Sequence, residues 1–224
     1  MKIKTMPDKA DRMAKNTWIQ TRHSRRVDPI VVCDGDMDRL SDSVCIDDIA
    51  HALSQKCRWT GHTREFYSIA DHSYQVSRHA ARIAVSSGLK CSTAALAGLM
   101  HDAAEAYLPD IASPIKDRFC IYDPNVPSIT PFRDIESDLL RAIIDGLGLP
   151  SIIIDDPMYM DIVRRADRAV LLAEARDLMD GLDDWISDSD DDPMPNVISP
   201  MTSKESRIKF SELFRMLSIP YGRF

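Results

Sequence analysis

The 224-residue sequence lacks any segment that would carry it into or across a membrane. It begins "MKIKTMPDKADRMAKN", without the apolar core of a signal peptide, and it contains no run of roughly 18 apolar residues. The five cysteines, an odd number, are scattered and include no CxxC pair, which favours reduced thiols over a disulfide framework. We therefore expect a cytoplasmic protein that does not bind a membrane.

An excess of positive charge is also absent. Lys and Arg number 28 against 35 Asp and Glu, so the net charge is −7 and no overall attraction to nucleic acid is expected. An anionic substrate would have to be held by local charges. Apolar residues make up 44% of the chain, which is enough to fill the core of a globular domain.

Helical periodicity dominates the chain after its first 45 residues. Residues 1–45 mix short β-prone pieces with turn residues, which predicts an irregular N-terminal extension. No internal repeat and no alternating strand ladder follow, so the sequence predicts an all-α main domain over 46–224. The expected helices begin near Cys45 and then cover roughly 67–87, 92–107, 132–147, 156–180 and 203–217, with Gly88, Gly148 and Gly181 ending three of them.

The stretch "LMHDAAEAYLPD", residues 99–110, places charged groups within an apolar helical pattern. In a helix over 92–107, His101, Asp102 and Glu105 would converge on one edge, while their neighbours are small or apolar nearly all round. Buried charges are costly unless they are paired or bound to a metal. An imidazole beside a carboxylate is a natural beginning of a divalent transition-metal site, but two ligands do not complete one.

Two further polar residues lie in helical patterns elsewhere in the chain. His72 occurs in "IADHSYQV", and Asp167 lies among apolar residues on the inward side of "VRRADRAVLLAEA". A single inward histidine is more often a hydrogen-bonded core residue than a ligand. Taken one by one, these residues leave both interpretations open.

The order His72, His101-Asp102, Asp167 resembles the HD-domain metal-dependent phosphohydrolases over roughly residues 45 to 180. The likeness is closest to their 5′-deoxynucleotidase branch and to the related phage dATP triphosphohydrolases. It implies an HD-domain helical bundle in which these four residues bind one divalent transition metal, such as Co, Mn, Zn, Fe or Ni. It also implies that Glu105 is the catalytic carboxylate that orients or deprotonates the attacking water. The alternative for Glu105 is an exposed helix residue.

The resemblance extends to an Arg-Trp pair, Arg58 and Trp59 in "CRW". The deoxynucleotidases place this pair over the nucleotide, where Arg58 would grip a phosphate and Trp59 would offer a flat surface to base or sugar. The alternative is an arginine and a tryptophan that merely pack in the core. His62 and Arg64 in the following loop add positive charge near the site, although solvated loop positions explain both equally well.

A sugar-contacting turn is implied at "PDIAS", residues 109–113. Asp110 would accept a hydrogen bond from the deoxyribose 3′-hydroxyl, with Ser113 close by in a position where the family has threonine. Lys116 follows at a distance suited to a phosphate. The compact deoxynucleotidases have no counterpart of residues 1–45, so the resemblance says nothing of them.

The implied reaction is hydrolysis at the 5′ phosphorus of a deoxynucleotide. A local cluster of cations in an acidic chain favours a triphosphate substrate, with dATP as first candidate and triphosphate as the released product. The cations of this cluster are Arg58, His62, Arg64, Lys116 and Arg118. A triphosphate could also require an additional Mg²⁺. The alternatives are a 5′-deoxynucleotidase acting on monophosphates and a non-catalytic, metal-stabilised nucleotide-binding protein. Because relatives are commonly dimers or larger rings, a homo-oligomer is expected.

Overall fold

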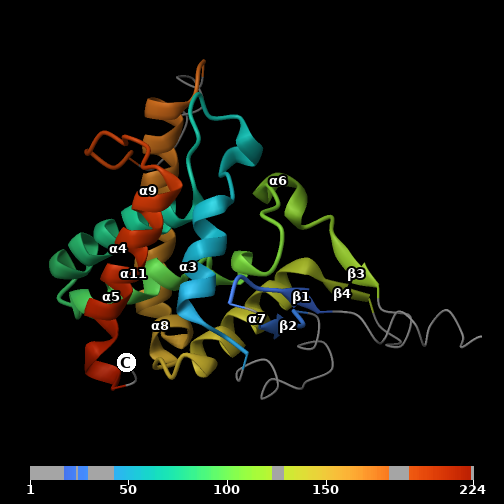
Figure 1. Cartoon of the computed structure of the whole chain (residues 1–224). Helices are drawn as coiled ribbons and strands as arrows, with labels where there is room; N and C mark the ends of the chain where they lie inside the picture. The colour runs from blue at the N-terminus through green and yellow to red at the C-terminus, as the bar shows by residue number, and fades with distance from the viewer. Residues whose placement is uncertain (1–17, 24, 30–42, 123–128, 182–191, 223–224) are drawn as a thin grey trace, which may run out of the picture.

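The fold is described from a computed structural model, which describes residues 18–23, 25–29, 43–122, 129–181 and 192–222 (Figure 1). Helices dominate these residues, which confirms the all-α prediction. They are α3 (Ile46–Gln55), α4 (Ile69–Ser86), α5 (Cys91–Met100), α6 (Ser113–Lys116), α7 (Phe132–Gly146), α8 (Ile152–Asp155), α9 (Pro157–Leu178) and α11 (Ser203–Ser218), with 3-10 turns at Trp59–Gly61, Ala103–Ala106 and Ile219–Tyr221.

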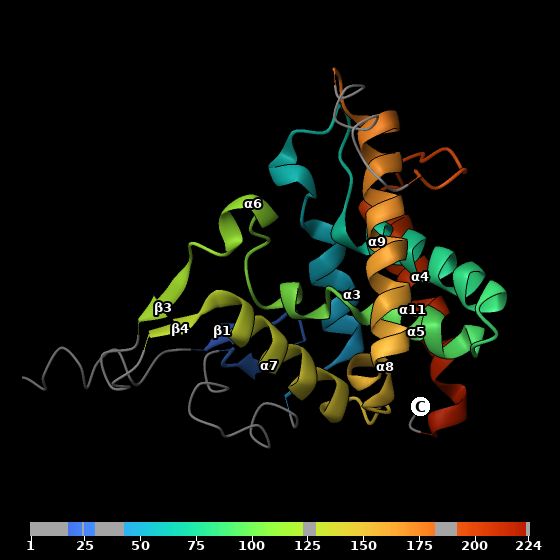
Figure 2. The same cartoon turned by 180° about the vertical axis from the view of Figure 1, so that it is seen from behind.

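The long helix α9 packs against α4 and α5, which cross it (Figure 2). Helix α11 packs against α3, α4 and α5. The core between these helices is filled by apolar side chains without solvent exposure, among them Leu53, Leu96, Leu99, Phe210 and Phe214. None of the helices in the described ranges is long and apolar enough to cross a membrane.

Helix α5 approaches α4 at a glycine. A Cβ atom added to Gly98 would lie 3.1 Å from the Cα atom of Ser77 and 3.2 Å from the Cβ atom of Ala80. The Ser77 hydroxyl also donates to the Ala95 carbonyl across the same contact (2.7 Å). The predicted close partners of this apolar segment are therefore found, and absence of a side chain at Gly98 permits the contact.

The predicted glycine ends of three helices are confirmed. Gly88, Gly148 and Gly181 all have positive φ, at 68°, 64° and 71°, which glycine adopts without steric cost. Helix α9 begins close to the predicted residue, where the Asp156 carboxylate accepts from the Met158 backbone N–H (2.8 Å).

Two short strands lie after residue 45, in a part of the chain where the sequence shows no alternating pattern. Strands β3 (Cys120–Tyr122) and β4 (Ile129–Pro131) form an antiparallel hairpin in which Ile121 lies opposite Thr130. It projects from the side of the molecule that carries α6 (Figures 1 and 2). Three-residue strands are too short to show the alternation by which a strand is recognised in a sequence.

Only part of the predicted N-terminal extension lies within the described residues. It contains the short antiparallel pair β1 (Ile19–Gln20) and β2 (Arg26–Val27), and Val27 is buried in the core. The division of the chain at residue 45 stays a prediction. Cys33 lies outside the described residues, whereas Cys45, Cys57, Cys91 and Cys120 are free thiols, as expected.

Candidate metal centre

Four residues predicted as metal ligands meet where α4, α5 and α9 come together. The Nε2 atom of His72, on α4, lies 3.0 Å from Asp167 Oδ1 and 3.7 Å from Asp102 Oδ2. The Nε2 atom of His101 lies 3.2 Å from Asp102 Oδ2 and 4.0 Å from Asp167 Oδ1. We call these residues the four-residue cluster.

Both imidazole rings are held by their Nδ1 atoms. His72 Nδ1 lies 2.6 Å from Glu174 Oε1, and His101 Nδ1 donates to the Gly98 carbonyl at 2.8 Å. The two Nε2 atoms are buried, and within the described residues neither has a hydrogen-bond partner. Because a carbonyl only accepts, the proton of neutral His101 is on Nδ1 and its Nε2 lone pair faces the carboxylates. Two such nitrogens beside two carboxylates fit a divalent transition metal.

The predicted helix over 92–107 is too long, because α5 ends at Met100. Continuation would require the Gly98 carbonyl to accept from the Asp102 N–H, but the His101 side chain donates to that carbonyl instead. Asp102 takes φ −101° and ψ 16°, and a 3-10 turn follows. The end of α5 and the 3-10 turn after it therefore determine where the Asp102 and Glu105 side chains lie, instead of one continuous helix.

Glu174, which was not predicted as a site residue, contacts the His72 ring of the cluster at its Nδ1 atom. It is fully buried on α9, and its Oε2 atom accepts from the Trp59 indole N–H (3.0 Å) and lies 3.7 Å from Arg58 Nη2. Burial acts to raise the pKa of Glu174, but His72 and Arg58 hold it below its ordinary value. A signal was present, since Glu174 follows Asp167 by seven residues, which is two helical turns along the same face.

The Arg-Trp pair reaches the cluster from a strained turn. Trp59 and Thr60 both have φ of 53°, an uncommon conformation for residues other than glycine. Arg58 Nη1 lies 3.4 Å from Asp102 Oδ2. Burial acts to lower the pKa of Arg58, but the surrounding carboxylates, Glu174 first, raise it above its ordinary value, so the guanidinium stays charged.

Glu105 is buried near the cluster and is not an exposed helix residue. Its Oε1 atom lies 3.6 Å from Lys116 Nζ, and its Oε2 atom has no hydrogen-bond partner in the described part of the chain. In the metal-free chain, burial and the neighbouring carboxylates, Asp102 first, raise the pKa of Glu105 to about 9. Lys56, which the sequence analysis did not consider, donates to the backbone carbonyls of Glu105 and Leu108 and so fixes this turn.

Two of the predicted phosphate-binding cations are engaged by carboxylates. Lys116 Nζ donates to both oxygens of Glu136, at 2.8 and 3.1 Å. Arg64 donates to Asp180 Oδ1 (2.7 Å) and to carbonyls at the end of α9. The structure leaves His62, Ser113 and Arg118 exposed and Asp110 half-buried.

A cavity of about 280 Å³ adjoins the cluster between α5, α7, α8 and α9. His101 and Asp167 form part of its wall. The rest is mainly apolar and includes Leu140, Ile153 and Val163. An organic group attached to a phosphate at the cluster could therefore enter an apolar space.

Comparison with known proteins agrees with this arrangement. The HD-domain family model matches residues 69–175. The uncharacterized protein YfdR of Escherichia coli K12 is 34% identical over 143 residues, which cover 64% of this chain and 65% of that protein. An uncharacterized protein of Rhodobacter capsulatus is 35% identical over 141 residues, which cover 62% of each. The chain thus spans less than two thirds of the length of either relative. The residues that match the HD-domain model, 69–175, contain the whole four-residue cluster.

Proposed function

We propose that this chain is a metal-dependent phosphohydrolase and that the four-residue cluster binds one divalent metal. The observation that carries the proposal is the pair of buried Nε2 atoms, on His72 and His101, that face two carboxylates and make no hydrogen bond. Without a cation, such an arrangement leaves buried polar atoms unsatisfied. HD domains are generally metal-dependent phosphohydrolases, which is consistent with the donor set.

Each residue around the cluster has a distinct task in the proposed reaction. A bound divalent metal would act as a Lewis acid toward a phosphoryl oxygen and a water molecule. Arg58 supplies a permanent positive charge for a phosphate, in a position fixed by Asp102 and Glu174. Glu105 would orient the attacking water and accept its proton. Burial and the neighbouring carboxylates raise the pKa of Glu105, and a cation bound by the cluster would act against this rise and favour the ionised form that accepts a proton.

We propose a deoxynucleoside phosphate, cleaved at its 5′ phosphorus, as the substrate. The sequence resemblance supports this class. The apolar cavity beside His101 and Asp167 supports an organic group of moderate size next to the phosphate, because a group placed there would lose its contact with water.

Two members of this class remain as candidates. The sequence favours dATP, cleaved to deoxyadenosine and triphosphate, because of its local cations. A specific observation favours a monophosphate: Lys116 and Arg64 are already bound to Glu136 and Asp180 and are not available to a polyphosphate tail without breaking those pairs. We therefore place the 5′-deoxynucleotidase ahead of the triphosphohydrolase.

A product assay tests the proposal. Metal-free protein is supplied with Mn²⁺, Co²⁺ or Mg²⁺ and each deoxynucleoside mono-, di- and triphosphate, and the released inorganic product is identified. Phosphate from monophosphates alone supports the nucleotidase, whereas triphosphate released in one step from dATP supports the triphosphohydrolase. Nucleotide binding without any product would support the non-catalytic alternative.

A substitution tests the ligand assignment separately. His101→Ala should abolish metal binding and turnover together, because the cluster loses one of its two nitrogen donors. The matched control is His79→Ala, since His79 is half-buried on α4 but lies outside the cluster. Full metal occupancy in His101→Ala would contradict the assignment.

A further inference from the structure

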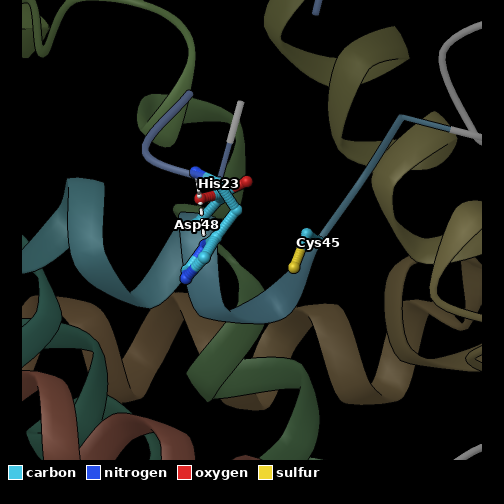
Figure 3. A group of neighbouring side chains, drawn as sticks. All are labelled: His23, Cys45 and Asp48. Carbon is cyan, nitrogen blue, oxygen red and sulfur yellow. Dashed lines mark hydrogen bonds and ion pairs between the residues drawn. The ribbon is translucent and has the colours of Figure 1, made fainter. Parts of the chain in front are cut away.

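A second group of possible ligands lies outside residues 69–175, where the N-terminal hairpin meets α3 (Figure 3). His23 lies in the turn after β1, Cys45 directly precedes α3, and Asp48 is in the first turn of α3. Each offers a ligand atom, and these three atoms lie within 4.8 Å of one another. The close approach depends on the hairpin, because His23 and Cys45 are distant in the sequence.

The Asp48 carboxylate is fixed but not fully satisfied. Its side chain is 2% exposed. Its Oδ1 atom lies 2.6 Å from His23 Nδ1 and accepts from the His23 backbone N–H at 3.0 Å. The other oxygen, Oδ2, is buried and has no hydrogen-bond partner among the residues that the structure describes. An ionised carboxylate with an unsatisfied buried oxygen indicates that a further positively charged or hydrogen-bonding group fits there.

Solvent reaches the Cys45 and His23 side chains, whereas the Asp48 side chain is buried. Cys45 is half-buried, and its side chain does not cap α3, whereas its carbonyl accepts from the Asp48 and Ile49 N–H groups. The His23 side chain is 48% exposed. An ion can therefore reach the group from solvent, and the Asp48 carboxylate lies at the positive end of the α3 helix dipole.

We propose that His23, Cys45 and Asp48 form a second metal site, which takes a thiophilic divalent ion of the zinc class. One nitrogen, one sulfur and one oxygen donor suit such an ion, with water in the fourth position. From bond lengths of about 2.0 to 2.3 Å, neighbouring donors around a tetrahedral ion lie about 3.3 to 3.7 Å apart. The His23–Asp48 contact of 2.6 Å would therefore open by about 0.7 Å, and the three donor atoms, which lie within 4.8 Å of one another, would come within about 3.7 Å.

Binding at this site would release one proton and join two segments. The Cys45 thiol proton leaves to solvent, and if His23 binds through Nδ1, its ring proton resides on Nε2. The ion would tie the hairpin turn to the start of α3, so metal should raise the midpoint of thermal unfolding. This second site does not depend on the proposed catalytic function.

Cobalt spectroscopy of the full chain distinguishes the two sites. A thiolate bound to Co²⁺ gives a charge-transfer band in the near ultraviolet, and the four-residue cluster contains no sulfur. We expect two cobalt ions per chain, with the band present. Cys45→Ser and His23→Ala should each reduce the stoichiometry to one ion and remove the band, while phosphohydrolase turnover is kept.

The matched control is Cys91→Ser, which replaces an exposed thiol directly at the start of α5. It should retain the band. Circular dichroism of each variant establishes that it is folded, and the retained ion at the four-residue cluster serves as a second check. Absence of the band from the unmodified chain at two equivalents of Co²⁺, or its persistence in Cys45→Ser, would overturn the proposal.

Discussion

Glu174 offers the sharpest test of how the fold supports the proposed metal site. Its two oxygens accept from two different N–H groups, on His72 and Trp59. In Glu174→Gln, only one of the two positions can be an oxygen, so the amide NH₂ must face a donor. The charge near Arg58 is also lost. The substitution therefore keeps the volume of the side chain and removes the support of the His72 ring.

We expect Glu174→Gln to weaken metal binding by about 10- to 100-fold, which is the usual effect of losing a group that orients a ligating histidine. This corresponds to about 1.4 to 2.7 kcal/mol of binding free energy. Isothermal titration of the metal-free protein with Mn²⁺ measures the affinity. Circular dichroism establishes that the helical fold persists.

The matched control is Asp161→Asn, because Asp161 is a half-buried carboxylate on α9 outside the four-residue cluster, and the variant loses the same charge. Its metal affinity should stay within twofold of that of the unmodified chain. If Glu174→Gln binds metal as tightly as this control, the reasoning is refuted, and Glu174 is a packing residue rather than a positioning residue.

Three further predictions follow from individual contacts. Glu105→Gln should keep metal and nucleotide binding but lower turnover by about 10² to 10⁴, as single-turnover kinetics will show; near-normal turnover would exclude catalysis by this carboxylate. Gly98→Ala should destabilise the fold by about 1 to 3 kcal/mol in urea unfolding, because the new methyl group meets the Ser77 backbone at 3.1 Å; an unchanged midpoint would show that α4 and α5 can separate at little cost. Burial acts to raise the pKa of Asp177, but hydrogen bonds from Arg176 and a backbone amide hold it below its ordinary value of 3.8. Asp177 thus contributes stability above that pH and loses it as the pH falls through its lower folded value. Because solvent screens this partly exposed pair, Asp177→Asn should cost about 1 kcal/mol at pH 7 and progressively less below pH 4. A difference in unfolding free energy that does not depend on pH would contradict this linkage.

Much of the helical architecture could be predicted from the sequence because its causes are local. Apolar residues at helical spacing indicated most of the helices, and the glycines at 88, 148 and 181 indicated where three of them end. Both signals act within one or two turns of chain, through side-chain burial and the allowed backbone angles. The four residues of the cluster could be named in advance because their types and order are distinctive.

The contacts that support or compete with the site were decided by tertiary packing. The sequence shows Lys116 and Arg64 as cations, but only the fold sets Glu136 and Asp180 against them. The sequence shows how many charged side chains there are, but it does not show which of them pair with one another.

Tertiary packing also determined the backbone and side-chain positions near the cluster. The sequence showed that residues 92–107 favour a helix, whereas the folded chain ends that helix at Met100, where His101 takes the Gly98 carbonyl. Glu174 meets His72, and His23 meets Asp48, across segments that are distant in the chain. Local propensity constrains each backbone segment, but the partners of buried polar groups are chosen only when helices pack and water is excluded between them.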